Sequence, residues 1–321
     1  MTPRLRRLLA GAAAMTGVLM VLGVYTAAAG AGLTCAGRWP FCDGFLGLFP
    51  ANWGSFLEWF HRLVAMLTGF LILGTTVQAW REGVAKGVRY ALVVATVILP
   101  FQIVLGALTV TEYEWVILTA HYVVATSIFT AVVAAAAWGL VDRGVPRIAD
   151  AVRLALVGAP VMLVLAPHAF VSFGPTTQAV YYVVGLATYA ALLAVTLWAN
   201  AAHGPRADAY GRLRFVTAPA SVVVVALLIA GRQVYGPVLE LAHLGGTVLA
   251  LVLVVGAAVL VRGGLPVPQA GELNDATDDG HRRGSLLLAA PRGSSQSLVG
   301  QLGWFRRQRF RYIRQQRQHL T

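Results

Sequence analysis

Hydrophobic residues in this chain come in long runs separated by short polar stretches, and the length of each run indicates the element it forms. A helix needs about 20 consecutive apolar residues to cross the hydrocarbon core of a bilayer. Runs of this kind lie at 8–31, 57–80, 90–110, 116–140, 152–172, 177–200, 215–235 and 238–261. The pattern predicts an all-α polytopic membrane protein with eight transmembrane helices.

The composition agrees with this fold class and argues against a soluble domain. Of 321 residues, 58% are hydrophobic and only 12% are charged, and the mean hydropathy is +0.70, unlike ordinary soluble domains. The first apolar run follows Arg4, Arg6 and Arg7 and continues to about Gly30. This run is long enough to span a bilayer, so we expect a first transmembrane helix rather than a cleaved signal peptide.

Basic residues are distributed unevenly along the chain, which has a net charge of +12. Of the 25 Lys and Arg residues, 22 lie in the N-terminal segment, in alternate loops or in the C-terminal tail, and the other three are Arg38, Arg62 and Arg232. Lys and Arg accumulate on the cytoplasmic side of membrane proteins. We therefore expect a multi-pass protein of the cell membrane, with both termini in the cytoplasm and the loop 32–56 on the outer face.

A weak internal repeat divides the predicted helices into two halves. The segments 116–121 and 238–243 both open a helix, both end in Ala-His, and lie 122 residues apart. Equal helix numbers on either side predict two pseudo-symmetric four-helix bundles, 1–140 and 150–262. The tail 263–321 is polar, then basic and aromatic, so we expect it to be partly disordered and to lie on anionic lipid. A nucleic-acid arm is the alternative, which attachment to a membrane protein disfavours.

Ionisable residues interrupt the start of the second predicted helix. Glu58, His61 and Arg62 share its first turns, where Glu58 and His61 (i,i+3) lie on one face and Glu58 and Arg62 (i,i+4) can pair. A charged group in mid-bilayer costs about 2.5–3.5 kcal/mol or more, so such residues are candidates for a functional site. The alternative interpretation is an ion pair near the headgroups beside a packed histidine.

Four histidines, His61, His121, His168 and His243, lie in predicted transmembrane helices near their outer ends. A lone intramembrane histidine often only hydrogen-bonds between helices. Facing histidines inside one four-helix bundle, however, are a usual way to ligate haem iron. We predict that His61 and His121 ligate haem in the first bundle.

Both cysteines lie in the loop 32–56. Cys35 and Cys42 are seven residues apart on the oxidising side of the membrane, so they can form a disulfide. A structural disulfide and a redox-active pair are both compatible with this position.

Taken together, these segments resemble the haem A synthase family, whose members assist assembly of haem-copper oxidases. The resemblance is carried by four segments in order: the cysteine loop 32–44, Glu58-x-x-His61-Arg62, 102–110 and Leu118–His121. It covers 1–140 well, and the second half only by topology and His243.

The resemblance implies two pseudo-symmetric bundles and oxidation of the C8 methyl of haem O to the formyl group of haem A. By this resemblance His61 and His121, with Arg62 nearby, would bind the substrate haem. Glu58 would be the catalytic carboxylate at the reacting methyl, and His243 would be an axial ligand of a haem b in the second bundle. Expected partners are haem O, an unidentified electron donor, haem O synthase and cytochrome oxidase subunits, with no nucleic acid.

The second half departs from the family pattern. The family has a histidine on the second helix of that bundle, where this chain reads Gln178–Gly185, and the second cysteine pair is absent. Either His168 supplies the second ligand, or the second haem is five-coordinate, Tyr-ligated or absent.

Two other functions fit parts of the pattern. A membrane b-type cytochrome that carries electrons would explain the paired histidines, but it needs neither Glu58 nor the cysteines. A transporter would use intramembrane Glu and His residues as a proton path. The parallel repeat and the scarcity of acidic residues in the apolar runs disfavour the transporter.

Overall fold

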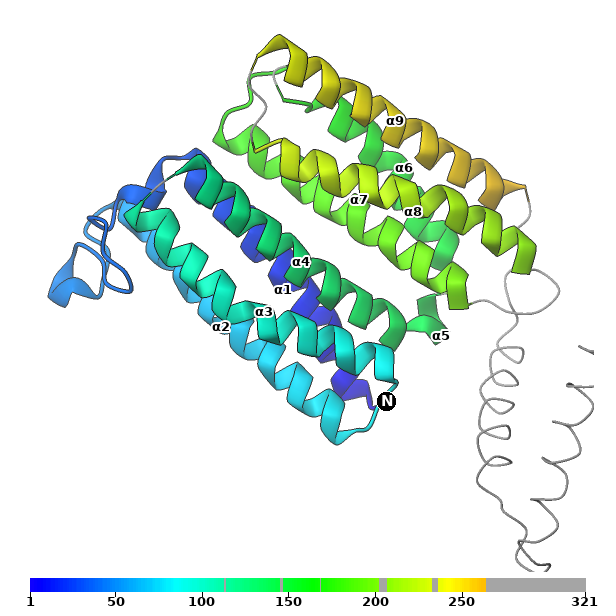
Figure 1. Ribbon diagram of the computed structural model, residues 1–321, viewed down its shortest axis with the longest axis horizontal. Helices are drawn as coiled ribbons and strands as arrows, with labels where there is room; N and C mark the ends of the chain where they lie inside the picture. Colours follow the sequence, from blue (N-terminus) through cyan, green and yellow to red (C-terminus); the bar gives the residue numbers. More distant parts are fainter. Residues whose placement is uncertain (113, 145–146, 168, 202–206, 233–235, 264–321) are drawn as a thin grey trace, which may run out of the picture. The chain divides into compact units, whose positions relative to one another are not determined.

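The computed structural model describes residues 1–112, 114–144, 147–167, 169–201, 207–232 and 236–263, which are helical apart from their loops (Figure 1). The helices are α1 (Pro3–Ala28), α2 (Trp53–Arg81), α3 (Lys86–Thr111), α4 (Trp115–Gly139), α5 (Val141–Gly144), α6 (Ile148–Val164), α7 (Pro175–Ala201), α8 (Ala207–Ala230) and α9 (Pro237–Arg262). Two short 3₁₀ turns, η1 (Ala31–Leu33) and η2 (Phe45–Gly47), lie between α1 and α2. His168 and the tail beyond Gly263 lie outside the described residues.

Seven of these helices are long and apolar enough to cross a membrane, which confirms an all-helical polytopic membrane protein. The sequence predicted eight spans, and α6 is the exception because it has only 17 residues. It ends at Val164, although the apolar run was expected to continue to 172. Pro167 accounts for the early end, since proline disfavours helical backbone in the preceding residue and has no N–H to donate.

Helix packing joins the described helices into one compact unit. Helices α1 and α3 each contact α2 and α4, while α7 and α9 each contact α6 and α8. Helix α7 also packs against α1 and α4. The largest apolar cluster accordingly combines Met20, Val24 and Phe129 with Leu186 and Leu192. Division into separate bundles at 1–140 and 150–262 therefore stays a prediction.

Two hydrogen bonds support the contact between α4 and α7. The hydroxyls of Thr130 and Tyr189 lie 2.8 Å apart, and Trp198 Nε1 donates to the carbonyl oxygen of Ala137 at 2.9 Å. Polar groups that face one another between apolar helices hold the helices together because no water competes for them.

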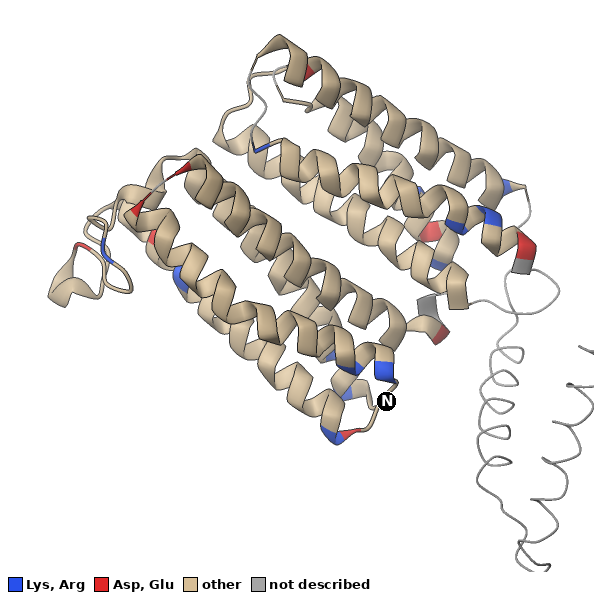
Figure 2. Cartoon of the chain, viewed as in Figure 1, with Lys and Arg blue, Asp and Glu red and all other residues tan. Residues whose placement is uncertain are grey.

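Lys and Arg gather at the helix ends beside the N-terminus (Figure 2). Arg81 ends α2 and Lys86 begins α3 at this end of the molecule. Nearby, the hydroxyl and backbone N–H of Thr2 donate to the carboxylate of Glu82 at 2.5 and 2.9 Å, and these bonds lower the pKa of Glu82 to about 2. The N-terminus is thus fixed to the polar connection between α2 and α3.

Candidate functional site

The site begins with the local structure that starts α2. Asn52 caps the helix, because its side-chain oxygen accepts the backbone N–H of Ser55 at 3.0 Å, a common N-cap arrangement. Glu58 then falls in the second turn with an exposed fraction of only 6%. A carboxylate so buried needs a partner to offset its desolvation.

Arg62 is that partner, and it also binds the preceding loop. Its Nε donates to Oε1 of Glu58 at 2.8 Å, so the predicted i,i+4 pair is formed. One terminal nitrogen donates to the backbone carbonyls of Phe41 at 2.9 Å, Arg38 at 3.1 Å and Pro40 at 3.4 Å. The other terminal nitrogen is buried and has no protein partner. The orientation of Glu58 therefore depends on the loop as well as on its own helix.

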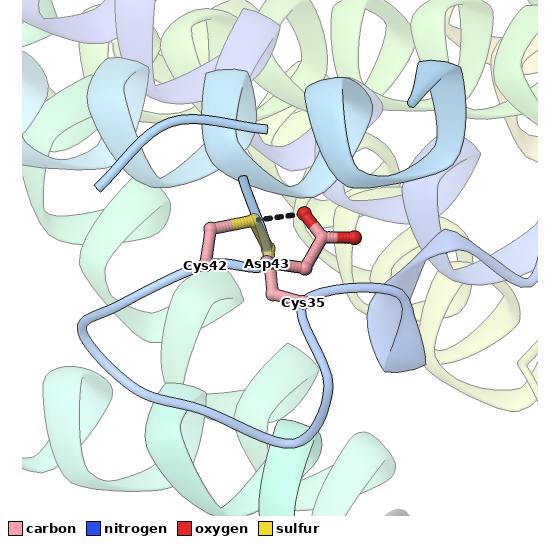
Figure 3. A group of neighbouring side chains, drawn as sticks. All are labelled: Cys35, Cys42 and Asp43. Carbon is pink, nitrogen blue, oxygen red and sulfur yellow. Dashed lines mark hydrogen bonds between the residues drawn. A yellow bond between two sulfur atoms is a disulfide. The ribbon is translucent and has the colours of Figure 1, made fainter. Parts of the chain in front are cut away.

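The loop is closed by a disulfide between Cys35 and Cys42, whose Cα atoms lie 4.3 Å apart (Figure 3). Both cysteines are buried, as expected for a structural disulfide. The Cys42 sulfur lies 3.3 Å from Oδ1 of Asp43, but a disulfide sulfur carries no proton, so this is a contact without donation. Cys35, Cys42 and Asp43 cluster closely enough for a metal ion, but the disulfide has consumed the thiolates that a metal would bind.

Asp43 links this loop to the first turn of α2. Its carboxylate accepts the hydroxyl of Ser55 at 2.5 Å, the backbone N–H of Ala51 at 3.0 Å and the side-chain amide of Asn52 at 3.3 Å. These bonds, above all the one from Ser55, hold the pKa of Asp43 below its ordinary value. The loop is therefore anchored to α2 on both sides of the disulfide, by Arg62 and by Asp43.

His61 lies one turn beyond Glu58 and faces α1. Its Nδ1 is buried without a hydrogen-bond partner. A Cβ atom at Gly23 of α1 would lie 2.8 Å from Cε1 of the imidazole, closer than real side chains approach. Gly23 thus makes the space that the ring occupies, and His61 retains a ring nitrogen available to a ligand.

His121 has a similar environment on α4. Its Nε2 lies 3.1 Å from the amide nitrogen of Gln102 on α3, and its Nδ1 is buried and unpartnered. A Cβ at Gly106 of α3 would lie 3.2 Å from the ring. Helices α1 and α3 each contact both α2 and α4, so the two predicted residues belong to one group of packed helices.

These residues fit a haem held between helices. Neutral imidazole with a free ring nitrogen ligates haem iron, and the buried unpartnered nitrogens of His61 and His121 meet that requirement. The free guanidinium nitrogen of Arg62 could donate to an acidic group on the same ligand.

His243 of α9 lies elsewhere and is enclosed. Its exposed fraction is 4%, and Nε2 lies 3.0 Å from the hydroxyl of Tyr181 on α7. Ligation of a second haem by His243 stays a prediction, and its proposed partner His168 lies outside the described residues.

Some residues of the site were not singled out from the sequence. Gly23 sits in an apolar run where nothing in the pattern distinguishes it from other small residues. Gln102 and Gly106 belong to the segment 102–110 that carries the resemblance, but only the packing of α3 against α4 shows that both adjoin His121.

The chain is similar to known proteins, and one match includes the residues described above. A family model described as cytochrome oxidase assembly protein matches residues 51–172. The protein named "Heme A synthase" of Bacillus licheniformis is 32% identical over 94 residues, which is 29% of this chain and 30% of that protein. The "Heme A synthase" of Bacillus pumilus is 30% identical over 96 residues, 29% of this chain and 31% of that protein.

A second group of relatives carries a different name. The "Protoheme IX farnesyltransferase" of Halobacterium salinarum is 38% identical over 133 residues, which is 40% of this chain and 28% of that protein. The chain thus spans under a third of the length of the curated relatives it matches. No solved structure matches it. The segment 51–172, which contains Glu58, His61, Arg62 and His121, is thus similar to the cytochrome oxidase assembly protein family.

Proposed function

We propose that this protein is a membrane-bound oxidoreductase that converts the C8 methyl of haem O to the formyl group of haem A for assembly of haem-copper oxidases. The observation that carries the proposal is the arrangement on α2. A buried carboxylate, Glu58, is held by Arg62 one turn from His61, whose ring nitrogen has no protein partner. Relatives named "Heme A synthase" support the same reaction.

In this proposal His61 and His121 bind the iron of the substrate haem. Glu58, one turn before His61, is then within reach of the porphyrin edge. A carboxylate there can accept a proton or stabilise positive charge that develops at the methyl carbon during oxidation. Arg62 keeps Glu58 in one orientation, which lowers the entropy cost of aligning it with the substrate.

We further propose that haem O synthase supplies the substrate and that an electron donor and cytochrome oxidase subunits are further partners. The gathering of Lys and Arg beside the N-terminus supports a cytoplasmic N-terminus (Figure 2). The disulfide loop, one helix length away along α1, is then on the outer face, where disulfides persist.

The test is to co-express the chain with a haem O synthase in cells that make no haem A, and to identify the extracted haems by chromatography and mass spectrometry. We expect haem A with the native chain. Glu58→Gln keeps the shape of the side chain but loses its charge, so haem O or a hydroxylated intermediate should accumulate on a protein that still binds haem.

Glu240→Gln is the matched control, because Glu240 lies in the first turn of α9 rather than beside His61. It should leave haem A production unchanged. Normal haem A with Glu58→Gln would remove Glu58 from the mechanism. A native chain that binds only unmodified haem b would favour the b-type cytochrome.

A further inference from the structure

The loop between α1 and α2 exposes several large apolar side chains. Phe45 and Leu46, at its tip in η2, have exposed fractions of 73% and 74%. Further exposed apolar side chains of the same loop and of the start of α2 are Trp39, Phe41, Leu48 and Trp53. Exposed apolar side chains gathered in one segment mark a contact with a partner or with a membrane.

Backbone hydrogen bonds hold the tip of the loop in one shape. The N–H of Cys42 donates to the carbonyl oxygen of Gly47, and the N–H of Gly44 donates to that of Phe49, both at 2.8 Å. Leu46 has a φ of +55°, in the left-handed region that is unfavourable for a residue with a bulky side chain. This leucine gains little burial within the protein, so its apolar surface is available to a contact outside the protein.

Aromatic rings connect the tip to the outward face of α2. Ring centroids lie 6.5 Å apart between Phe45 and Phe49, and 6.3 Å apart between Phe49 and Trp59 of α2. Phe56 lies 6.3 Å from Trp59 and 5.8 Å from Phe60. Phe60 begins a row of exposed apolar side chains on α2 that continues with Leu67 and Phe70. Because α2 is long and apolar enough to span a membrane, this row lies against lipid, and the apolar surface of the loop is continuous with it.

The direction of the loop agrees with a position at the membrane surface. Figure 1 shows the stretch between η1 and α2 extending sideways from the ends of the helices, across their axes rather than beyond them. Spanning helices cross the bilayer, so a segment that leaves their ends sideways runs along the lipid–water interface. The exposed side chains at the tip are therefore at the depth where the headgroups meet the acyl chains.

The composition of the loop suits this depth. Tryptophan is enriched at membrane–water interfaces, and the exposed side chains include Trp39 and Trp53. Only Arg38 and Asp43 are charged between residues 33 and 53. The carboxylate of Asp43 is held toward α2 by its hydrogen bonds from Ala51 and Ser55, so it does not oppose contact of the tip with lipid.

We propose that Phe45 and Leu46 insert into the lipid–water interface beside α2, which makes this loop an interfacial anchor. The partner is the lipid itself, and zwitterionic lipid suffices because the contact is apolar. The anchor does not depend on the reaction proposed above. Backbone carbonyls of the same loop accept from Arg62, so lipid that holds the loop also supports the position of the partner of Glu58.

The experiment uses Phe45→Trp as a fluorescent reporter in the full-length protein, reconstituted in nanodiscs of phosphatidylcholine. The fluorescence that the new tryptophan adds is obtained by subtracting the native protein measured in the same way. We expect lipid brominated in the upper acyl chain to quench most of this added fluorescence, and aqueous iodide to quench little of it. Ala85→Trp is the control, because Ala85 is exposed in the polar connection between α2 and α3. Its added fluorescence should show the opposite pattern.

Leu46→Asp beside the reporter tests whether apolar contact holds the tip in lipid. Aspartate tolerates the left-handed backbone better than leucine does, so the shape of the turn is kept. The charge should raise quenching by iodide and lower quenching by brominated lipid. Leu46→Trp is the second reporter, for a Phe45→Trp variant that does not fold.

Two results would overturn the proposal. The first is a reporter that iodide quenches in nanodiscs and brominated lipid does not. If such a reporter were shielded from iodide only in native membranes, the tip would bind a protein partner instead of lipid. The second is a reporter whose quenching does not change with Leu46→Asp.

Discussion

Loss of the Arg62 side chain should have the largest effect on the stability of the structure around Glu58. The Arg62 and Glu58 side chains are only 16% and 8% exposed, and they pair at 2.8 Å. Removing one partner of a buried pair costs about 3–5 kcal/mol, because the remaining charge is left desolvated. Arg62→Gln also removes the charged donor to three loop carbonyls. We therefore expect the free energy of unfolding to fall by about 3 kcal/mol or more.

The matched control is Arg153→Gln. Arg153 pairs with Asp150 at 3.0 Å, but the two side chains are 76% and 67% exposed. Exposed pairs contribute about 0–1 kcal/mol because water already solvates both charges. The control should therefore change stability little, although it removes the same kind of side chain from a helix.

Equilibrium unfolding of the detergent-purified protein, followed by circular dichroism, measures both changes. The double variant Glu58→Gln, Arg62→Gln tests whether the unpaired carboxylate of Glu58 causes the loss of stability. It should be more stable than Arg62→Gln alone, because it removes the unpaired buried carboxylate. Equal effects of Arg62→Gln and Arg153→Gln, or a double variant less stable than both single ones, would refute the reasoning.

Three further predictions follow from other contacts. Gly23→Ala should lower haem content, because the new methyl group would lie 2.8 Å from the His61 ring. Gly11→Ala on the same helix is the control and should leave haem content unchanged, because a Cβ there has no neighbour within 4 Å. Equal haem content in both variants would show that the contact between Gly23 and His61 is unimportant. Cys35 and Cys42 should react with a membrane-impermeant thiol reagent on intact cells only after reduction. Labelling without reductant would contradict the disulfide. The lowered pKa of Asp43 stabilises the folded loop above the ordinary aspartate pKa of about 3.9, and this stability is lost as pH falls through the lowered value. Limited proteolysis should cut the native loop faster at pH 3 than at pH 6, with a smaller change in Asp43→Asn. The same pH dependence of cleavage in the native protein and in Asp43→Asn would exclude a stabilising role for the Asp43 carboxylate.

The sequence predicted contacts well where the partners are close along the chain. Glu58 and Arg62 are four residues apart on one helix, so helix geometry alone brings them together. Cys35 and Cys42 are the two cysteines of the chain and share one loop, which left a single intramolecular pairing. The end of α6 was less predictable, because hydropathy does not register where Pro167 stops the helix.

Contacts between distant segments could not be predicted in the same way. Gly23 adjoins His61 only because α1 packs against α2, and Tyr181 meets His243 only because α7 and α9 face the same interior. A tyrosine in an apolar run is compatible with many neighbours. Helix packing decides which of these neighbours its hydroxyl contacts.

The hydrophobic pattern by itself determined the membrane-spanning, all-helical architecture, because bilayer thickness fixes the length of each apolar run and every backbone polar group in lipid must be satisfied within a helix. Helix periodicity likewise determined that Glu58, His61 and Arg62 share one region of α2. Only the tertiary structure decided which nitrogen of each histidine is paired. Nδ1 of His61, His121 and His243 is buried without a partner. Nε2 of His121 lies against Gln102 and Nε2 of His243 against Tyr181, because hydrogen bonding and ring packing depend on the side chains that neighbouring helices present.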